Sequence, residues 1–153
     1  MTTFLLKALA DHVKTTLDAD SGERIDVSGA FSQAAKLELK RDRVLLMPLE
    51  DRSRPSTVMD LVRQPSDFGF GVLYRVRNRR DDLAGLVEIE ALRKRVFAAL
   101  LGWPDTADAV PDTDPEVFGV VEHRRGRVQL PESDREQCWL DQFTVSVIRT
   151  QEA

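Results

Sequence analysis

Alternation of apolar and polar positions is the clearest pattern in this chain. In Phe68–Val76 every second residue is a large apolar side chain, with glycine, leucine and arginine between them. A similar alternation runs through Trp139–Ile148, where Phe143, Val145 and Val147 share a face. A period of two is typical of a strand that buries one face. We therefore expect both segments to be strands of one sheet.

Two segments carry the three-and-four spacing of an amphipathic helix. In Phe4–Leu17 the apolar residues form one stripe. A longer stripe in Leu86–Leu101 is formed by Ile89, Leu92, Val96 and Leu100. Gly102 follows this stripe as a residue suited to a helix C-cap, and Pro104 prevents continuation. The second helix is therefore expected to end at Gly102.

The segments between these elements are short or polar. Arg43–Leu49 is an apolar run ended by a proline, which predicts a buried strand. Arg24–Val27 is a shorter strand candidate, and Phe31–Lys40 is ambiguous, with a composition that favours a short helix. Glu50–Asp67 is polar and contains two prolines. We expect it to be a long excursion with a helical turn at Val58–Val62.

A further region with strand character precedes the last strand. Val117–Val121 and Arg127–Leu130 are strand-like and flank His123–Gly126, which has the composition of a turn. The region is therefore either a hairpin or one long bent strand. Asp105–Pro115, which comes before it, is rich in Asp, Thr and Pro and predicts a loop.

Together these elements predict an α+β fold for a single domain over residues 1–153. Their order favours a mostly antiparallel or mixed sheet of four to five strands. The two main helices should pack on one face of this sheet, because each carries one apolar stripe. A chain of 153 residues is also of ordinary size for one domain.

Composition and charge argue against several classes of protein. The chain has 26 acidic and 22 basic residues and a formal net charge of −4, which argues against a dedicated nucleic-acid binder. Cys138 is the only cysteine, so no internal disulfide can form and a reducing compartment is expected. No apolar run approaches the roughly 20 residues of a membrane helix. The N-terminal residues lack the pattern of a signal peptide.

Residues suited to catalysis or metal binding are few. His12, His123 and Cys138 do not stand at metal-site spacings, so we expect no metal or other cofactor. We expect His12 to be a structural histidine at the edge of a helix stripe and His123 to be a solvated turn residue. A small hydrolase with a Cys138–His123 nucleophilic pair is the alternative from another class. Asp105–Glu116 lacks the alternating ligands and the central glycine of a calcium loop, which favours an acidic, solvated loop.

Basic residues gather in three parts of the chain, around Arg75–Arg80, Arg93–Arg95 and Arg124–Arg127. Nucleic-acid binding would require these parts to converge on one face. Because acidic residues outnumber basic ones, we expect an outward sheet edge and helix face paired with nearby acids. A surface of mixed sign also suits a charge-matched protein interface.

The end of the second helix, Ala98–Pro104, the variable loop after it and the strand Trp139–Arg149 form a recognisable series. Gln64 precedes the alternating strand, and the first helix has the form A-L-A-x-x-V-K-x-x-L. This series resembles the tail terminator proteins of long-tailed bacteriophages, including the Mu-like group. The resemblance covers most of the chain in order and length and is least clear in Ser28–Asp51.

The resemblance implies a structural virion protein of the tail and neck, assembled in the host cytoplasm, and no enzyme. Such proteins form a ring, most often a hexamer, on the last ring of the tail tube. They end tube polymerisation and provide the head and neck attachment surface. The implied partners are further copies of the chain, the tail tube protein and a head-completion or neck protein, with a tail sheath or tape measure protein as further candidates. DNA passes only as cargo, and no membrane takes part.

Two polar segments, Glu50–Asp67 and Asp105–Glu116, are the candidates for the protein contacts of such a ring. Their charged candidate residues are Arg52, Arg54, Arg63, Asp105, Asp108, Asp112, Asp114 and Glu116. A different neck or head-completion connector ring is the alternative within the same class, and binding to portal instead of tube would distinguish it.

Overall fold

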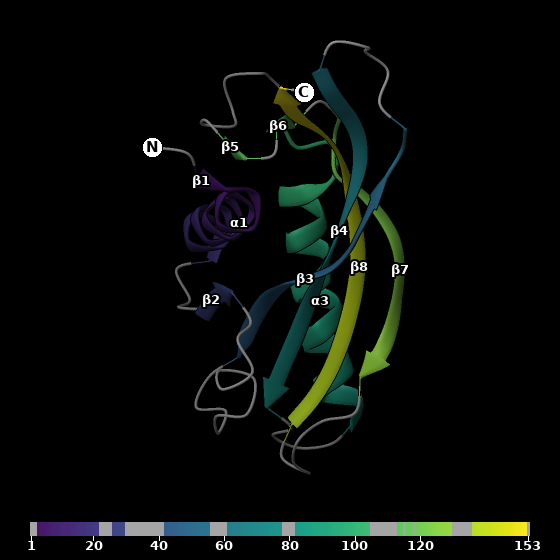
Figure 1. Ribbon diagram of the computed structural model, residues 1–153. Coiled ribbons are helices and arrows are strands. Elements are labelled where there is room, and N and C mark those ends of the chain that lie inside the picture. The colour runs from purple at the N-terminus through teal and green to yellow at the C-terminus, as the bar shows by residue number, and fades with distance from the viewer. Residues whose placement is uncertain are drawn as a thin grey trace.

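The protein has two layers, a long sheet and two helices against one of its faces (Figure 1). The computed structural model describes residues 3–21, 26–29, 42–55, 61–77, 82–104, 113–114, 116–117, 119–129 and 136–152. The helices are α1 (Leu5–Ser21) and α3 (Asp82–Leu100). The strands are β1 (Thr3–Phe4), β2 (Asp26–Gly29), β3 (Arg43–Ser53), β4 (Leu61–Arg77), β5 (Thr113–Asp114), β6 (Glu116–Val117), β7 (Glu122–Gln129) and β8 (Glu136–Glu152).

Within these residues, six strands form the main sheet in the order β2-β3-β4-β8, with β6 and β7 both paired to the other edge of β8. The sheet is thus five strands across. β2 pairs with β3 in parallel, and the other pairs in this sheet are antiparallel. β1 and β5 form a separate parallel pair. The predicted α+β fold with a mostly antiparallel sheet is confirmed.

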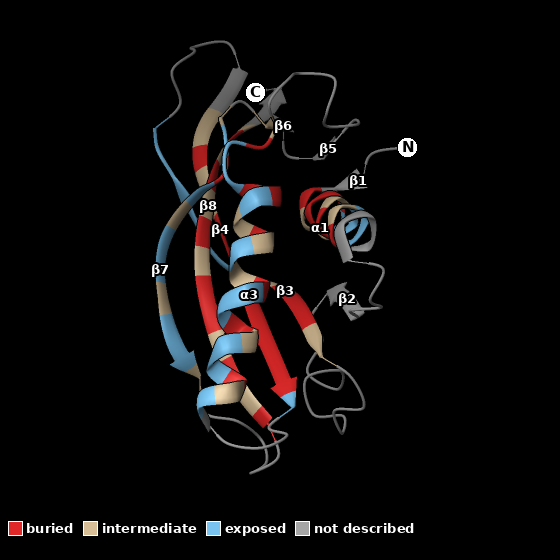
Figure 2. Cartoon of the chain, turned by 180° about the vertical axis from the view of Figure 1, so that it is seen from behind, coloured by how far each residue is buried: buried red, intermediate tan, exposed pale blue. Residues whose placement is uncertain are grey.

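Both helices pack on the same face of the sheet, as predicted. The main core joins Leu9 and Val13 of α1 and Val96 of α3 to Phe70 of β4 and Phe143 of β8, all almost fully buried. Figure 2 shows the buried residues of β4 and β8 running behind α3. Burying large apolar side chains of this kind contributes about 1.5–3 kcal/mol each. None of the helices among the described residues is long and apolar enough to cross a membrane.

The predicted period of two is confirmed in both long strands. In β4 the alternate residues Phe70, Val72, Tyr74 and Val76 are fully buried under the helices. In β8 the same face holds Phe143, Val145 and Val147. The other face of the sheet has its own buried cluster, formed by Leu45, Leu73, Cys138 and Leu140. The central part of the sheet is therefore buried on both faces.

The strands around Glu50–Asp67 are longer than predicted. β3 passes through Pro48 with a shift in register and ends at Ser53. β4 already begins at Leu61. The predicted excursion is therefore wrong for residues 50–53 and 61–67, which belong to strands. The predicted helical turn is wrong at Leu61 and Val62, and its earlier residues lie outside the described ones. The physical reason is that β8 continues to Glu152 and supplies backbone hydrogen-bond partners to the polar part of β4, residues 63–67.

The turn expected at His123–Gly126 is not formed, so of the two arrangements expected here the bent strand is found and the hairpin is not. These residues belong to β7, one bent strand that pairs with β8 and has a bulge between His123 and Arg125. A bulge suits this sequence, because it accommodates an extra residue and bends the strand without ending it. The predictions for Phe31–Lys40 and for most of Asp105–Pro115 fall outside the described residues.

The end of α3 follows the prediction. Gly102 has φ +80°, a conformation that favours glycine, and it follows the last helical turn directly.

The ring of Trp103 stacks on His12 of α1, with 4.7 Å between the ring centres. His12 Nε2 donates a hydrogen bond to the carbonyl oxygen of Ala99 at 2.8 Å. His12 therefore joins the two helices, which confirms its predicted structural role.

Candidate functional site

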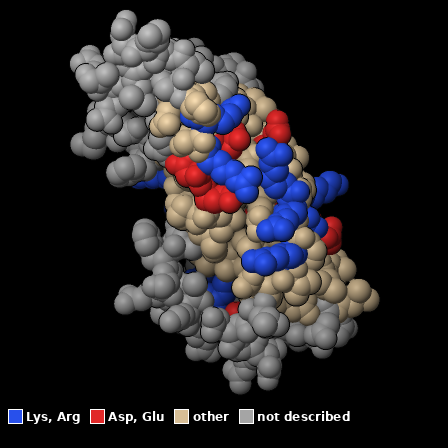
Figure 3. All heavy atoms as spheres, turned by 45° about the vertical axis from the view of Figure 1, so that its right-hand side comes forward, with Lys and Arg blue, Asp and Glu red and all other residues tan. Residues whose placement is uncertain are grey.

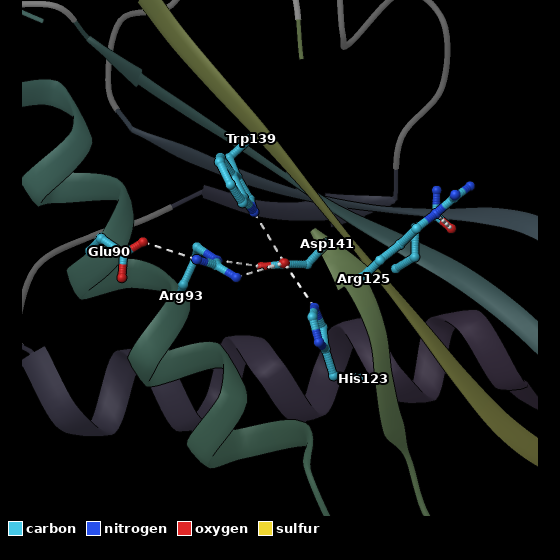
Figure 4. A network of polar contacts seen from close by, with 7 residues as sticks. Glu90, Arg93, His123, Arg125, Trp139 and Asp141 are labelled. Atoms are coloured by element: carbon cyan, nitrogen blue, oxygen red, sulfur yellow. Dashed lines mark hydrogen bonds and ion pairs between the residues drawn. The ribbon is translucent and has the colours of Figure 1, made fainter. Parts of the chain in front are cut away.

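A cluster of polar contacts around Asp141 connects α3, β7 and β8 (Figure 4). The Asp141 carboxylate lies in β8 and is fully buried. It accepts hydrogen bonds from Arg93 Nε at 2.8 Å, Arg93 Nη2 at 3.1 Å, His123 Nε2 at 3.0 Å and Trp139 Nε1 at 3.1 Å. Because the arginine bond is bidentate, both its distance and its direction are fixed.

Aromatic rings enclose this cluster. The Arg93 guanidinium lies 4.6 Å from the ring centre of Trp139 and 5.3 Å from that of Phe97. The His123 ring contacts Phe97 and Phe143. Such cation–π and ring contacts add to the hydrogen bonds. The cluster is therefore a rigid connection between the helix layer and the edge of the sheet.

The charges of this cluster act on its neighbours. The hydrogen bond to Asp141 raises the pKa of Arg93, so the guanidinium stays charged. Burial raises the pKa of Tyr74 strongly, and the negative charge of Asp141 raises it further. The Tyr74 hydroxyl lies near this carboxylate, yet it makes no hydrogen bond of normal geometry to any described residue. Tyr74 therefore stays protonated and serves as a packing residue.

The bulge in β7 determines which side chains reach this cluster. His123 lies opposite Phe143 and Gly126 lies opposite Asp141, so both face the helices although they are three residues apart. Without the extra residue they would face opposite sides of the sheet. The bulge therefore allows one strand to supply both a histidine donor and a glycine at the same carboxylate.

Gly126 allows β7 to approach the cluster closely. A Cβ atom added there would overlap Asp141 Oδ1 and stand 2.7 Å from Trp139 Nε1. We predict that Gly126→Ala lowers the free energy of unfolding by about 1–3 kcal/mol, because buried groups must shift. Urea unfolding would measure it, with Val128→Ala on the same strand as control. Val128 is 66% exposed, so its truncation should change stability by less than about 0.5 kcal/mol. Equal stability of the two variants would contradict the steric role.

The same bulge gathers three arginines on the face that α3 does not cover. We call Arg124, Arg125 and Arg127 the β7 arginine row. Arg124 Nε donates to Thr144 Oγ1 and Arg125 Nε to Gln142 Oε1, both at 3.0 Å. All three arginines are exposed, and Figure 3 shows Lys and Arg gathered on this side of the molecule.

The expected pairing of basic residues with acids is only partly correct. Arg75 pairs with a carboxylate inside the protein, and Arg93 pairs both with buried Asp141 and with exposed Glu90 on the outer face of α3. In the part of the chain that the structure describes, no carboxylate forms an ion pair with the β7 arginine row. The prediction of paired arginines is therefore wrong for β7.

A second ion pair lies on the face of the sheet opposite the helices. Arg75 Nη2 contacts Glu136 Oε2 at 2.8 Å, and both side chains are 3% exposed. Cys138 Sγ donates to Glu136 Oε1 at 3.7 Å. Burial, followed by the nearby Glu136 charge, raises the pKa of Cys138 to about 12. The thiol is thus protonated at neutral pH, which disfavours a nucleophilic role.

The Cys138–His123 pair of the hydrolase alternative does not form. His123 faces the helices and binds Asp141, whereas Cys138 points to the other face of the sheet. The prediction that His123 is a solvated turn residue was also wrong, since the ring is partly buried. Among the described residues there is no group of three or more His, Cys, Asp or Glu that could hold a metal ion.

The predicted contact residues fall into three groups. Arg52 on β3 and Arg54 directly after β3 are exposed and lie 3.6 Å from Glu50 and Asp67, respectively. Arg52 shares the helix-free face with the β7 arginine row. The backbones of Arg63, Asp114 and Glu116 belong to β4, β5 and β6. Asp105, Asp108 and Asp112 lie outside the described residues.

Sequence reasoning missed the Asp141 cluster as a unit. One signal was available, because Asp141 stands between Trp139 and Phe143 at a position where the alternation predicts a buried side chain. A buried carboxylate requires a charged or hydrogen-bonding partner. The partner could not be found from the sequence, since Arg93 is 48 residues away.

Comparisons with known proteins agree with this fold. The family model for the phage tail terminator protein matches residues 5–153. Among solved structures, a chain of the virion of a native gene transfer agent particle is similar, with a TM-score of 0.58 and 16% identity, over 95% of this chain and 96% of that chain. At this identity the likeness shows the fold alone. No curated protein matches the sequence. Because the family match extends over nearly the whole chain, the protein belongs to the phage tail terminator family, a family of structural tail proteins.

Proposed function

We propose that this protein assembles into a hexameric ring that caps the tail tube, ends tube polymerisation and offers an attachment surface to the head or neck. The observation that carries the proposal is the family match over residues 5–153. The fold supports it, because helices cover only one face of the sheet and charged side chains are exposed on the other. A domain of this kind can contact its own copies head-to-tail, and a fixed rotation then closes a ring.

The arm formed by β3 and β4 is the first proposed contact. Its residues from Pro48 to Pro55 are all exposed, and the two strands pair as far as Ser53 and Ser66. β4 also pairs with β8 from Leu61 onward, so the arm is held in an ordered sheet. Ordering before binding reduces the entropy that a contact costs. We assign Arg52, Arg54 and Arg63 to contacts with the tail tube or with a neck protein.

The acidic segment, residues 105–116, is the second proposed contact. It contributes Asp105, Asp108, Asp112, Asp114 and Glu116. A terminator must resemble a tube subunit on one ring face and reject a further subunit on the other, which shape and charge can achieve together. The proposed partners are the tail tube protein, a head-completion or neck protein, and a tail sheath or tape measure protein. DNA would pass through the channel as cargo.

Light scattering after size-exclusion chromatography, combined with electron microscopy of purified tail tubes, tests the proposal. We expect the protein to add density at one tube end and to reach the mass of a ring there. A monomer in isolation would not contradict this, because ring formation can depend on the tube as partner. A protein that stays monomeric at every concentration and leaves tube ends bare would contradict it. Binding to portal and not to tubes would support the connector-ring alternative.

A further inference from the structure

The β7 arginine row is an exposed line of positive charge on the helix-free face of the sheet. It follows alternate residues of β8 from Thr144 to Leu140. Because a strand rises about 3.3–3.4 Å per residue, the row is about 13–14 Å long. Figure 3 shows Lys and Arg side chains close together on this side of the molecule. The row is therefore a linear array of cations and not a single exposed side chain.

Neutral neighbours hold two of these arginines and leave their charge uncompensated. Arg124 Nε donates to Thr144 and Arg125 Nε donates to Gln142, so the terminal nitrogens of both guanidinium groups have no partner among the described residues. A planar guanidinium presents its donors in a geometry that matches a phosphate group. The row can therefore bind an oxyanion without first losing an internal ion pair.

The carboxylates on the same face leave the row positive. Glu50 and Asp67 lie 3.6 Å from Arg52 and Arg54, respectively, so each has a cation of its own. Glu122 precedes the row on β7 and is exposed. The formal charge of β7 is nevertheless +2, from three arginines and this one carboxylate, whereas the whole chain has a formal charge of −4. Positive charge is therefore concentrated on this strand.

The surroundings of the row favour a rod-shaped polyanion over an acidic strand of another protein. β7 has an open edge among the described residues, but a bulge and arginines on an edge both oppose the addition of a strand. The exposed side chain of Val128 faces the helix side, and beside the row β8 presents Thr144 and Gln142. Leu49 is 40% exposed on the helix-free face, but it lies over Gly71 of β4, beyond β8 from the row. The row therefore lacks the apolar centre of a stable protein interface.

The Asp141 cluster holds the row in place from the other side of the sheet. His123, which directly precedes the row, is hydrogen-bonded to the buried Asp141 carboxylate. Arg93 joins the same carboxylate to α3. Because β7 is fixed to the helix layer in this way, binding at the row requires little ordering of the backbone.

We propose that the β7 arginine row binds the phosphate backbone of double-stranded DNA, in a weak contact that does not depend on base sequence. The inference rests on the proposed function, in which a DNA duplex passes through the assembled ring. It goes beyond that function, since passage alone requires no attraction between duplex and protein. A duplex carries about one negative charge per 1.7 Å of its axis, so several phosphates lie along the length of the row.

A contact of this kind is compatible with movement of the DNA. Contacts to phosphates alone carry no sequence information and allow a protein to slide along the duplex. Three arginines in one copy form few contacts, whereas several copies around one duplex act together. The row would therefore steady the duplex in the channel without blocking its passage.

Fluorescence anisotropy with a labelled duplex of about 30 base pairs tests the contact. At about 50 mM salt we expect a wild-type Kd of about 1–100 µM, equal within about threefold for an A·T-rich and a G·C-rich duplex. Arg124→Gln/Arg127→Gln should weaken binding at least about tenfold. Between about 50 and 200 mM salt, it should also reduce the slope of log K against log salt by at least about 1.

Two further variants control for net charge and for the substituted positions. Lys7→Gln/Lys14→Gln removes the same charge from exposed positions of α1 and should bind DNA within about threefold of the wild type. Arg124→Lys/Arg127→Lys keeps the charge and should retain most of the binding, because lysine also contacts phosphate. Circular dichroism and urea unfolding of each variant would confirm that the fold is intact.

Three outcomes would overturn the inference. The first is a wild-type protein without saturable DNA binding at about 50 mM salt. The second is an equal loss of binding in Arg124→Gln/Arg127→Gln and in the α1 control, which would reflect net charge alone. The third is normal DNA binding by the row variant together with loss of binding to tail tubes, which would identify an acidic protein as the partner of the row.

The proposed function fails or stands separately from this contact. If the row variant loses DNA binding and still stops tube growth, both the DNA contact and the capping function are supported. If the wild type binds DNA through the row but does not stop tube growth, the capping function fails and the DNA contact remains.

Discussion

Replacing Asp141 with alanine is expected to lower the free energy of unfolding by about 3–5 kcal/mol. The carboxylate is fully buried and accepts hydrogen bonds from three side chains, Arg93, His123 and Trp139. Its removal leaves the Arg93 guanidinium, which is 17% exposed, without its buried partner. It also removes the connection between α3 and the edge strand β7. Urea unfolding followed by tryptophan fluorescence would report on stability, and on Trp139 within the cluster itself.

Glu90→Ala is the matched control, because Glu90 contacts the same guanidinium from the outside. Glu90 Oε1 lies 2.9 Å from Arg93 Nη1, but its side chain is 71% exposed. Exposed pairs of this kind are worth about 0.2–1 kcal/mol, so the control should change stability little. A similar small loss for Asp141→Ala would show that the cluster does not stabilise the fold.

Replacing Glu136 with leucine is expected to be similarly costly, by about 3–5 kcal/mol. The substitution removes the carboxylate that lies 2.8 Å from Arg75 in a site where both side chains are 3% exposed. The buried Arg75 guanidinium then lacks this negatively charged partner. A charge without such a partner is unfavourable in the low-dielectric interior of a protein. Thermal and urea unfolding would both measure the loss.

The double variant Arg75→Met/Glu136→Leu separates the value of the pair from the cost of breaking it. Replacing both partners of a buried pair with apolar residues is often neutral or stabilising. We therefore expect the double variant to recover most of the stability lost in Glu136→Leu, with a coupling of more than about 1 kcal/mol. Additive losses would indicate that the two residues act independently.

The parts of the fold that local patterns specify could be predicted from the sequence. The buried face of β4 follows from strict alternation between Phe68 and Val76, and a single buried face leaves one possible register for its side chains. The end of α3 follows from Gly102 and Pro104, which act on the backbone at their own positions. These predictions succeeded because the physical cause lies within a few residues of the effect.

Predictions failed where a distant strand supplied the deciding contact. Residues 63–67 contain no large apolar side chain, yet they form a strand because β8 offers them backbone partners. His123–Gly126 has turn-like residues, yet pairing with β8 and a bulge keep them extended. The buried role of Asp141 depends on Arg93 in another element. The local pattern of apolar and polar residues does not show which segments far apart in the sequence pair with one another.

For the contact residues proposed from the sequence, the structure gives their position but does not test their role. Arg52 and Arg54 are exposed on the β3–β4 arm, and their role in binding stays a prediction. The β7 arginine row was visible as a basic cluster, but its common face could not be foreseen. Two consecutive arginines share one face only because of the bulge, which is a feature of pairing and not of composition.

Tube growth in the presence of the protein is the most direct measurement of the central claim. Tail tube protein would be polymerised from preformed tube seeds, with the terminator added during elongation, and tube lengths would be measured by electron microscopy. We predict that growth stops soon after the addition, with a ring visible at the tube end and lengths independent of further incubation. Tubes that continue to lengthen at the rate of the untreated sample, with the protein present in excess, would contradict the account.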